Sequence, residues 1–393
     1  MNKKRYAIYF LGFLITFHLA LTTYIESSFI EQTLLKAGIL NAKGLSGIVF
    51  SVAFLITCLI GFNISRFLKR FGNFKISVWT CSIEICALLG LSFSQILPPE
   101  LLLALFVIHS VTASTIYFNL DLFLERFSSD KDTGFIRGSY FTAGNIAFII
   151  APFVASLLID GGNYWKIFSV ATIIMIIALC SLLLNLSDHI DTTYEKISFF
   201  ETLKKIWWNK DINHIMTTSF LLQFFYAWMT IYGLLYLRDV ILLPEKTILG
   251  IIMPIALIPF VLFELFLGDI ADKLFGEKEI LTIGFIIMGI STITMYFATS
   301  TDLWFWAGLL FMTRVGASFV EIMNETYFYK KVDATEASLI AFYKNMKPIA
   351  FLIAPILATI ILTSTGSYQS LFFILGVIVL SGTLFSATIK DTL

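Results

Sequence analysis

The sequence has little charge, few cysteines and few prolines for its length. Only 14% of its 393 residues are Asp, Glu, Lys or Arg and 58% are apolar, which excludes a water-soluble globular protein. The four cysteines lie in apolar runs without metal-ligand spacing, so we expect them to serve in packing. No nucleotide-binding loop, metal-ligand cluster, nucleophile elbow or large soluble segment is visible, so the sequence predicts no cofactor, no resident metal, no nucleic-acid partner and no enzyme activity.

Long apolar runs are what the sequence does contain. A window of about 19 residues finds twelve runs, each near the ~20 residues that cross the hydrocarbon core as a helix. The first run follows basic residues, as in a signal peptide, but it is too long and lacks a cleavage site, so we expect it to be a membrane helix. The runs lie at 6–26, 44–64, 76–96, 101–124, 138–159, 166–186, 213–236, 247–268, 279–299, 302–326, 337–362 and 368–389.

The distribution of positive charge predicts the orientation. If the N-terminus is cytoplasmic, the cytoplasmic segments hold 19 of the 27 Lys and Arg residues, and the opposite segments hold five. The positive-inside rule therefore places both termini in the cytoplasm, with the chain crossing the cell (inner or plasma) membrane many times. A basic loop, SRFLKRFGNFK after the second run, contributes most to this asymmetry.

The longest internal connection divides the runs into six and six. We expect an N-terminal six-helix bundle at 1–186, a cytoplasmic linker at 187–212 and a C-terminal six-helix bundle at 213–393. In the linker, Ser198 and Glu201 have the spacing of a capping box, and an apolar face lies opposite Lys204 and Lys205. This pattern predicts a short amphipathic helix, either on the inner leaflet or docked on the bundle. Its apolar face comprises Phe199, Phe200, Leu203, Ile206 and Trp207.

The fifth and eleventh runs repeat one sequence. Residues 145–159 read NIAFIIAPFVASLLI and residues 348–362 read PIAFLIAPILATIIL, at a separation of 203. Two similar six-helix halves are typical of a transporter built from parallel repeats, with its substrate site between the halves near the midplane. The small residues and prolines of the repeat also suit close helix packing. These packing candidates are Ala151, Pro152, Ala354 and Pro355.

The segments after the second and eighth runs add a second match. They read GFNISRFLKR from Gly61 and GDIADKLFGEK from Gly268, and with the repeat they make the chain resemble the major facilitator superfamily. The resemblance implies a twelve-helix secondary transporter in which this motif helps to close the cytoplasmic side. The first copy has Ser65 where the family has Asp, and Leu68 where it has Gly, which puts a two-sided latch in doubt. The second copy supplies the candidates Gly268, Asp272, Lys273 and Gly276.

Polar residues occur near the middle of four runs. At a separation of 205, His18 aligns with Gln223 and His109 with Arg314, and the resemblance implies that these helices line the central cavity. Arg314 is the strongest candidate for an anionic or hydrogen-bond-accepting group of the substrate, because guanidinium keeps its charge and its fork of donors. His18 could instead sense protons or simply pack. The predicted substrate-binding residues are His18, His109, Gln223, Tyr226 and Arg314.

Further charges lie toward the cytoplasmic ends of the tenth and eleventh runs. Glu321 and Glu325 follow Arg314 on one helical face, and Lys344 and Lys347 lie at comparable depth on the next run. We expect these residues to pair when the cavity is closed to the inside and to separate during alternating access, or else to form a static network between two helices. Asp121, near the inner end of the fourth run, is another coupling or gating candidate.

Two more carboxylates lie in the first half. Glu84 is deep in the third run, a peripheral helix by the resemblance, so we expect it to bond to a neighbouring helix. Glu26 ends the first run, where the headgroup region can accommodate it.

The leading prediction is a secondary transporter that moves a small organic solute by alternating access, coupled to an ion, the proton. Loose matches to an exporter motif, together with an aromatic cavity, suggest export of amphiphilic compounds. The alternatives are an uptake permease for an anionic metabolite and a non-transporting membrane sensor that kept the fold. The expected partners are the substrate, the proton and the lipid bilayer, and the expected state is a monomer.

Overall fold

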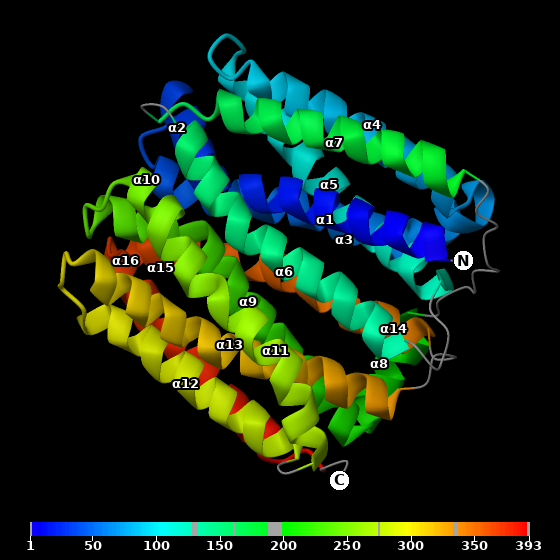
Figure 1. The fold of residues 1–393 in the computed structure, drawn as a ribbon. Coiled ribbons are helices and arrows are strands. Elements are labelled where there is room, and N and C mark those ends of the chain that lie inside the picture. Colours follow the sequence, from blue (N-terminus) through cyan, green and yellow to red (C-terminus); the bar gives the residue numbers. More distant parts are fainter. Residues whose placement is uncertain are drawn as a thin grey trace. The chain divides into compact units, whose positions relative to one another are not determined.

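The computed structural model describes residues 2–127, 133–159, 162–187, 199–273, 276–332 and 337–390, and its elements are helices (Figure 1). Helices are expected in a chain this apolar, because a backbone in lipid must satisfy its hydrogen bonds within the segment. The first half forms α1 Asn2–Thr23, α2 Glu26–Lys36, α3 Ala42–Phe71, α4 Asn73–Ser92, α5 Pro99–Phe127, α6 Thr133–Leu158 and α7 Trp165–Leu186.

The second half begins with a short helix, and its last two spans are each interrupted by one residue, Asn345 and Ser381. It forms α8 Phe199–Trp208, α9 Lys210–Asp239, α10 Glu245–Thr247, a π-helical turn Ile248–Ile252, α11 Met253–Lys273, α12 Glu277–Phe297, α13 Leu303–Lys331, α14 Ala337–Lys344, α15 Met346–Thr365, α16 Tyr368–Leu380 and α17 Gly382–Ser386.

The twelve predicted spans are confirmed in order. Ten segments of the described chain are long and apolar enough to cross a membrane, and two shorter apolar segments, Leu45–Gly61 and Thr142–Leu158, take the second and fifth places. The all-α membrane fold follows from this match.

Three local features differ from the predicted pattern. The expected outer loop after the first span contains α2, and the basic segment expected as a loop after the second span forms the last turns of α3. Lys69 and Arg70 suit the C-terminal end of a helix dipole, and Gly72, with φ of 81°, ends α3. The eleventh span is broken at Asn345, because Pro348 has no N–H to bond to the carbonyl of Lys344.

The helices form two compact units. Unit 1 comprises Met1–Glu195 with Glu245–Gly250, and unit 2 comprises Lys196–Pro244 with Ile251–Leu393. In unit 1, α1 packs against α5, α6 and α7, while α4 packs against α5 and α7, and α2 and α3 pack against α5. In unit 2, α9 packs against α13, α15, α16 and α17, and α12 packs against α13 and α16.

The repeated sequence has the same environment in each unit. It lies in α6, which packs on α1, and in α15, which packs on α9. The alanines of both copies are buried, as are Pro152 and Pro355, and the isoleucines at 150 and 353 are exposed. Trp228 of α9 donates its indole N–H to the carbonyl of Ala354 (2.5 Å), and the Tyr232 hydroxyl donates to the carbonyl of Pro355 (3.4 Å). Both predicted packing pairs therefore lie within helix contacts.

The linker helix α8 is docked along one side. Thr202 and Ile206 are buried, where α8 contacts α9 and α14, whereas Leu203, Trp207 and Trp208 are exposed. The bundle therefore covers only part of the predicted apolar face.

Helices α12 and α13 cross closely at two glycines. A Cβ atom on Gly316 would lie 2.6 Å from the carbonyl oxygen of Gly284, closer than real Cβ contacts. Gly316→Val should therefore lower the free energy of unfolding by about 1–3 kcal/mol through overpacking. Denaturant unfolding in detergent measures the loss. Gly308→Val is the control, because Gly308 lies in the same helix with open space around it, and equal effects of the two variants would contradict the prediction.

Candidate functional site

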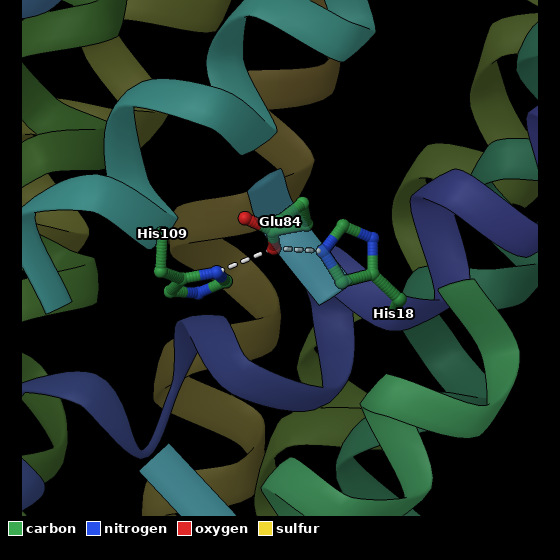
Figure 2. Close-up of side chains that lie close together, drawn as sticks. All are labelled: His18, Glu84 and His109. Carbon is green, nitrogen blue, oxygen red and sulfur yellow. Dashed lines mark hydrogen bonds and ion pairs between the residues drawn. The ribbon is translucent and has the colours of Figure 1, made fainter. Parts of the chain in front are cut away.

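Unit 1 contains a buried cluster of ionisable side chains from three helices. His18 of α1, Glu84 of α4 and His109 of α5 point toward one another (Figure 2) and are 0%, 0% and 1% exposed. Each comes from a different membrane span, so packing of α1, α4 and α5 brings together residues far apart in sequence. The prediction that Glu84 bonds to a neighbouring helix is confirmed, and it bonds to two.

One carboxylate oxygen is the centre of the cluster. Glu84 Oε1 lies 2.9 Å from His18 Nε2 and 2.6 Å from His109 Nδ1. The other oxygen, Glu84 Oε2, accepts a hydrogen bond from the hydroxyl of Thr112. Among the described residues, the ligating atoms of the two histidines and Glu84 all lie within 4.8 Å of one another, so this group could hold a metal ion.

The outer nitrogens of the two imidazoles also have partners. His18 Nδ1 donates to the carbonyl oxygen of Ile15 at 2.8 Å, and His109 Nε2 lies 3.4 Å from Glu26 Oε1. Glu26 is buried in the first turn of α2. The helix that sequence reasoning missed brings this second carboxylate to His109.

Arg314 lies inside unit 2. Its side chain is 4% exposed, and its guanidinium carbon lies 5.1 Å from the ring centroid of Phe225 on α9. Arg314 Nη1 also donates to the Thr313 hydroxyl at 3.4 Å. Gln223 and Tyr226 are partly exposed, whereas their neighbours in the middle of α9 are buried. Three of the five predicted substrate residues are thus on two helices that contact each other.

A carboxylate on α13, Glu321, bonds to α9 and lies near a lysine of α15. Glu321 Oε2 accepts a hydrogen bond of 2.6 Å from the Tyr226 hydroxyl of α9. Lys347 of α15 lies near enough for its positive charge to act on the carboxylate of Glu321. Glu325 lies near enough for its negative charge to act on the hydroxyl of Tyr343. Lys344 ends α14 and Lys347 is in the first turn of α15, so the two lysines flank the break at Asn345.

The second signature segment ends α11 and begins α12. Gly268, Asp272 and Lys273 lie in the last turns of α11 and Gly276 caps α12, but the side chains of the first three, and of Asp121 in α5, are outside the described residues. Next to the cap, Glu277 is 0% exposed and pairs with Lys330 Nζ of α13 at 2.6 Å.

Sequence reasoning missed this pair and the hydrogen bond from Thr218 of α9 to Asn324 of α13, which is 2.7 Å long. The acidic character of Glu277 was visible, but nothing in its spacing to Lys330 predicted the contact, since 53 residues separate them.

One comparison with known proteins identifies a family. The sequence profile of the Major Facilitator Superfamily matches residues 6–243 and 241–391. A search of curated protein sequences finds no match.

Solved transporter structures share the fold. The POT family transporter PepTSo has a TM-score of 0.78 at 11% identity, over 98% of this chain and 97% of that one. The nucleoside transporter NupG has 0.73 at 15% identity, over 99% and 100%. A POT family transporter in complex with 5-aminolevulinic acid has 0.76 at 13% identity, over 97% and 95%.

Proposed function

Since the chain belongs to the Major Facilitator Superfamily, a family of secondary transporters, we propose that it moves a small organic solute across the membrane by alternating access. The absence of any nucleotide-binding loop in the sequence supports an ion or solute gradient as the energy source. The proposed orientation has both termini in the cytoplasm, from the bias of Lys and Arg.

The observation that carries the substrate proposal is the buried guanidinium of Arg314. A charge in a membrane span is costly, about 2.5–3.5 kcal/mol on insertion scales, and usually marks a substrate or ion path. The Phe225 ring offers it a cation–π contact, with the guanidinium carbon 5.1 Å from the ring centroid. We assign Arg314 to an anionic or hydrogen-bond-accepting group of the solute, with Gln223 and Tyr226 as further polar contacts.

His18 and His109 receive no substrate role in this proposal, because both direct ring nitrogens toward Glu84. A nucleoside transporter and a POT family transporter in complex with 5-aminolevulinic acid have similar folds, which agrees with a polar organic solute. An anionic metabolite fits Arg314 better than an uncharged amphiphile does, so uptake or exchange of such a metabolite is the form of the proposal that we favour over amphiphile export.

The proposed coupling ion is the proton, and Glu321 is its proposed carrier. A carboxylate that is partly buried in the span, bonded to Tyr226 and influenced by Lys347, can exchange a proton as these contacts change. Dissipating the pH gradient should then abolish solute accumulation in proteoliposomes while leaving solute exchange intact. Accumulation that persists without the gradient would contradict proton coupling.

A thermal-shift screen of small organic anions and amphiphiles tests the substrate site. Solutes that stabilise the parent should bind Arg314→Ala about 10–100-fold more weakly, because a charged hydrogen bond contributes about 1.5–3 kcal/mol. Arg238→Ala is the control, since Arg238 pairs with the adjacent Asp239 at 2.7 Å near the end of α9. Equal affinity of the parent and Arg314→Ala would refute the assigned role.

Flux separates transport from sensing. Parent protein in liposomes should exchange the solute found by the screen, and Arg238→Ala should do the same. Binding without any solute-dependent flux would favour a membrane sensor that kept the fold and would refute the proposed transport.

A further inference from the structure

We propose that His18, Glu84 and His109 form a binding site for one divalent metal ion of the zinc class inside unit 1. The ion would link α1, α4 and α5, and its binding requires no substrate and no transport. The proposal follows from where the hydrogen atoms of the cluster must lie.

The first constraint concerns His18. A carbonyl oxygen only accepts hydrogen bonds, so the contact of 2.8 Å to Ile15 requires a hydrogen on His18 Nδ1. In the neutral imidazole the lone pair is then on Nε2, the atom that faces Glu84 Oε1 at 2.9 Å. Two acceptors thus face each other in a site closed to bulk water.

The second constraint concerns His109. Its Nε2 faces Glu26 across 3.4 Å, and a carboxylate requires a donor there, which places the lone pair of the neutral ring on Nδ1. That lone pair faces the same oxygen, Glu84 Oε1, at 2.6 Å. The Thr112 hydroxyl holds the second oxygen of Glu84.

These contacts are the outer-shell pattern of a metal site. Ligating histidines usually donate their other N–H to a carbonyl or a carboxylate, and ligating carboxylates are themselves hydrogen-bonded. His18 uses the carbonyl of Ile15, His109 uses Glu26, and Glu84 uses Thr112. Each ligand therefore has a partner on the side away from the shared point, and three lone pairs remain directed at that point.

The ligand set and the charge both suit zinc. Two imidazole nitrogens and one carboxylate oxygen are a known zinc set, with the fourth position open. Bonds of ~2.0–2.1 Å in a tetrahedron separate ligand atoms by about 3.3 Å, so the ion would widen the two contacts at Glu84 by about half an ångström. A divalent charge also balances Glu84 and Glu26 together, which lowers the cost of burying two carboxylates in the membrane.

Zinc titration of the full-length chain tests the site. Protein in detergent, carrying no histidine tag and stripped of metal, should bind one Zn²⁺ per chain in competition with a fluorescent chelator. Zinc-edge X-ray absorption should show a shell of nitrogen and oxygen at ~2.0–2.1 Å. This second measurement needs no variant. A sulfur ligand at about 2.3 Å, as Cys81 near Glu84 would give, overturns the assignment.

Variants locate the ion and identify competing sites. Glu84→Gln and His109→Asn should each weaken Zn²⁺ binding by at least about 100-fold, and Thr112→Val by about 10-fold, as expected for ligand and outer-shell changes. A background variant that lacks other possible zinc ligands should bind Zn²⁺ as the parent does. It combines the substitutions His189→Asn, His214→Asn, Cys86→Ser and Cys180→Ser. Less than one bound Zn²⁺ per chain in the parent would mean that protonated imidazoles neutralise the carboxylates, and the proposal would fail. Loss of binding in the background alone would also overturn it.

Discussion

Replacing Lys330 with methionine should lower the free energy of unfolding by about 2–3 kcal/mol, less than the full cost of breaking a buried pair, because the Lys330 side chain is 37% exposed. Glu277 is 0% exposed, and Lys330 Nζ approaches its Oε1 to 2.6 Å. Methionine keeps the length of the aliphatic chain but removes the charge. The pair joins the first turn of α12 to the last turn of α13, so denaturant unfolding in mixed micelles should detect the loss as a lower transition midpoint.

The adjacent lysine provides a matched control. Lys331 Nζ lies 3.9 Å from Asp211 Oδ2, and these two side chains are 32% and 20% exposed. Solvent screens such a pair, so Lys331→Met should cost at most about 1 kcal/mol. If the two variants unfold alike, the burial of Glu277 does not determine the effect. Glu277→Gln combined with Lys330→Met should recover part of the stability, because no unpaired charge remains.

Much of the fold could be predicted from local sequence. Twelve apolar runs predict twelve helical spans, because a backbone in hydrocarbon must form its hydrogen bonds within the segment. The repeat at Ala151 and Ala354 predicts that two of these helices are equivalent. Helix α2 and the break in the eleventh span were not predicted, because neither depends on the mean hydropathy of a long segment. Helix α2 is amphiphilic and short, so no hydropathy window detects it, and the break at Asn345 depends on a single proline, Pro348, near a helix start.

The clusters were less predictable than the spans. His18, Glu84 and His109 were each visible as polar residues in apolar runs, and Glu84 was expected to bond to a neighbouring helix. Their convergence depends on the rotation of α1, α4 and α5 about their axes, which tertiary packing determines and the hydropathy of these nearly all-apolar helices does not. For the same reason the sequence showed no metal-ligand spacing: the ligands come from three spans, 66 and 25 residues apart.

Glu321→Lys should abolish transport, and Lys347→Glu added to it should restore most of the activity. Glu321 and Lys347 come from α13 and α15, and the charge of Lys347 acts on the carboxylate in the described conformation. Placing two lysines there removes the proposed proton carrier and sets like charges against each other, so transport should fall by more than about 100-fold. Exchanging the charges recovers the attraction with reversed polarity, so a cycle that forms and breaks this pair can run again.

A second double variant shows whether recovery depends on position or only on net charge. Lys347→Glu with Glu279→Lys has the same charge change as the exchange, but Glu279 is exposed in the first turn of α12. Solute flux in proteoliposomes should stay low in this variant. Equal flux in the two double variants would show that net charge alone decides. If the exchange restores no flux although the protein folds, the proposed pairing of Glu321 with Lys347 is contradicted.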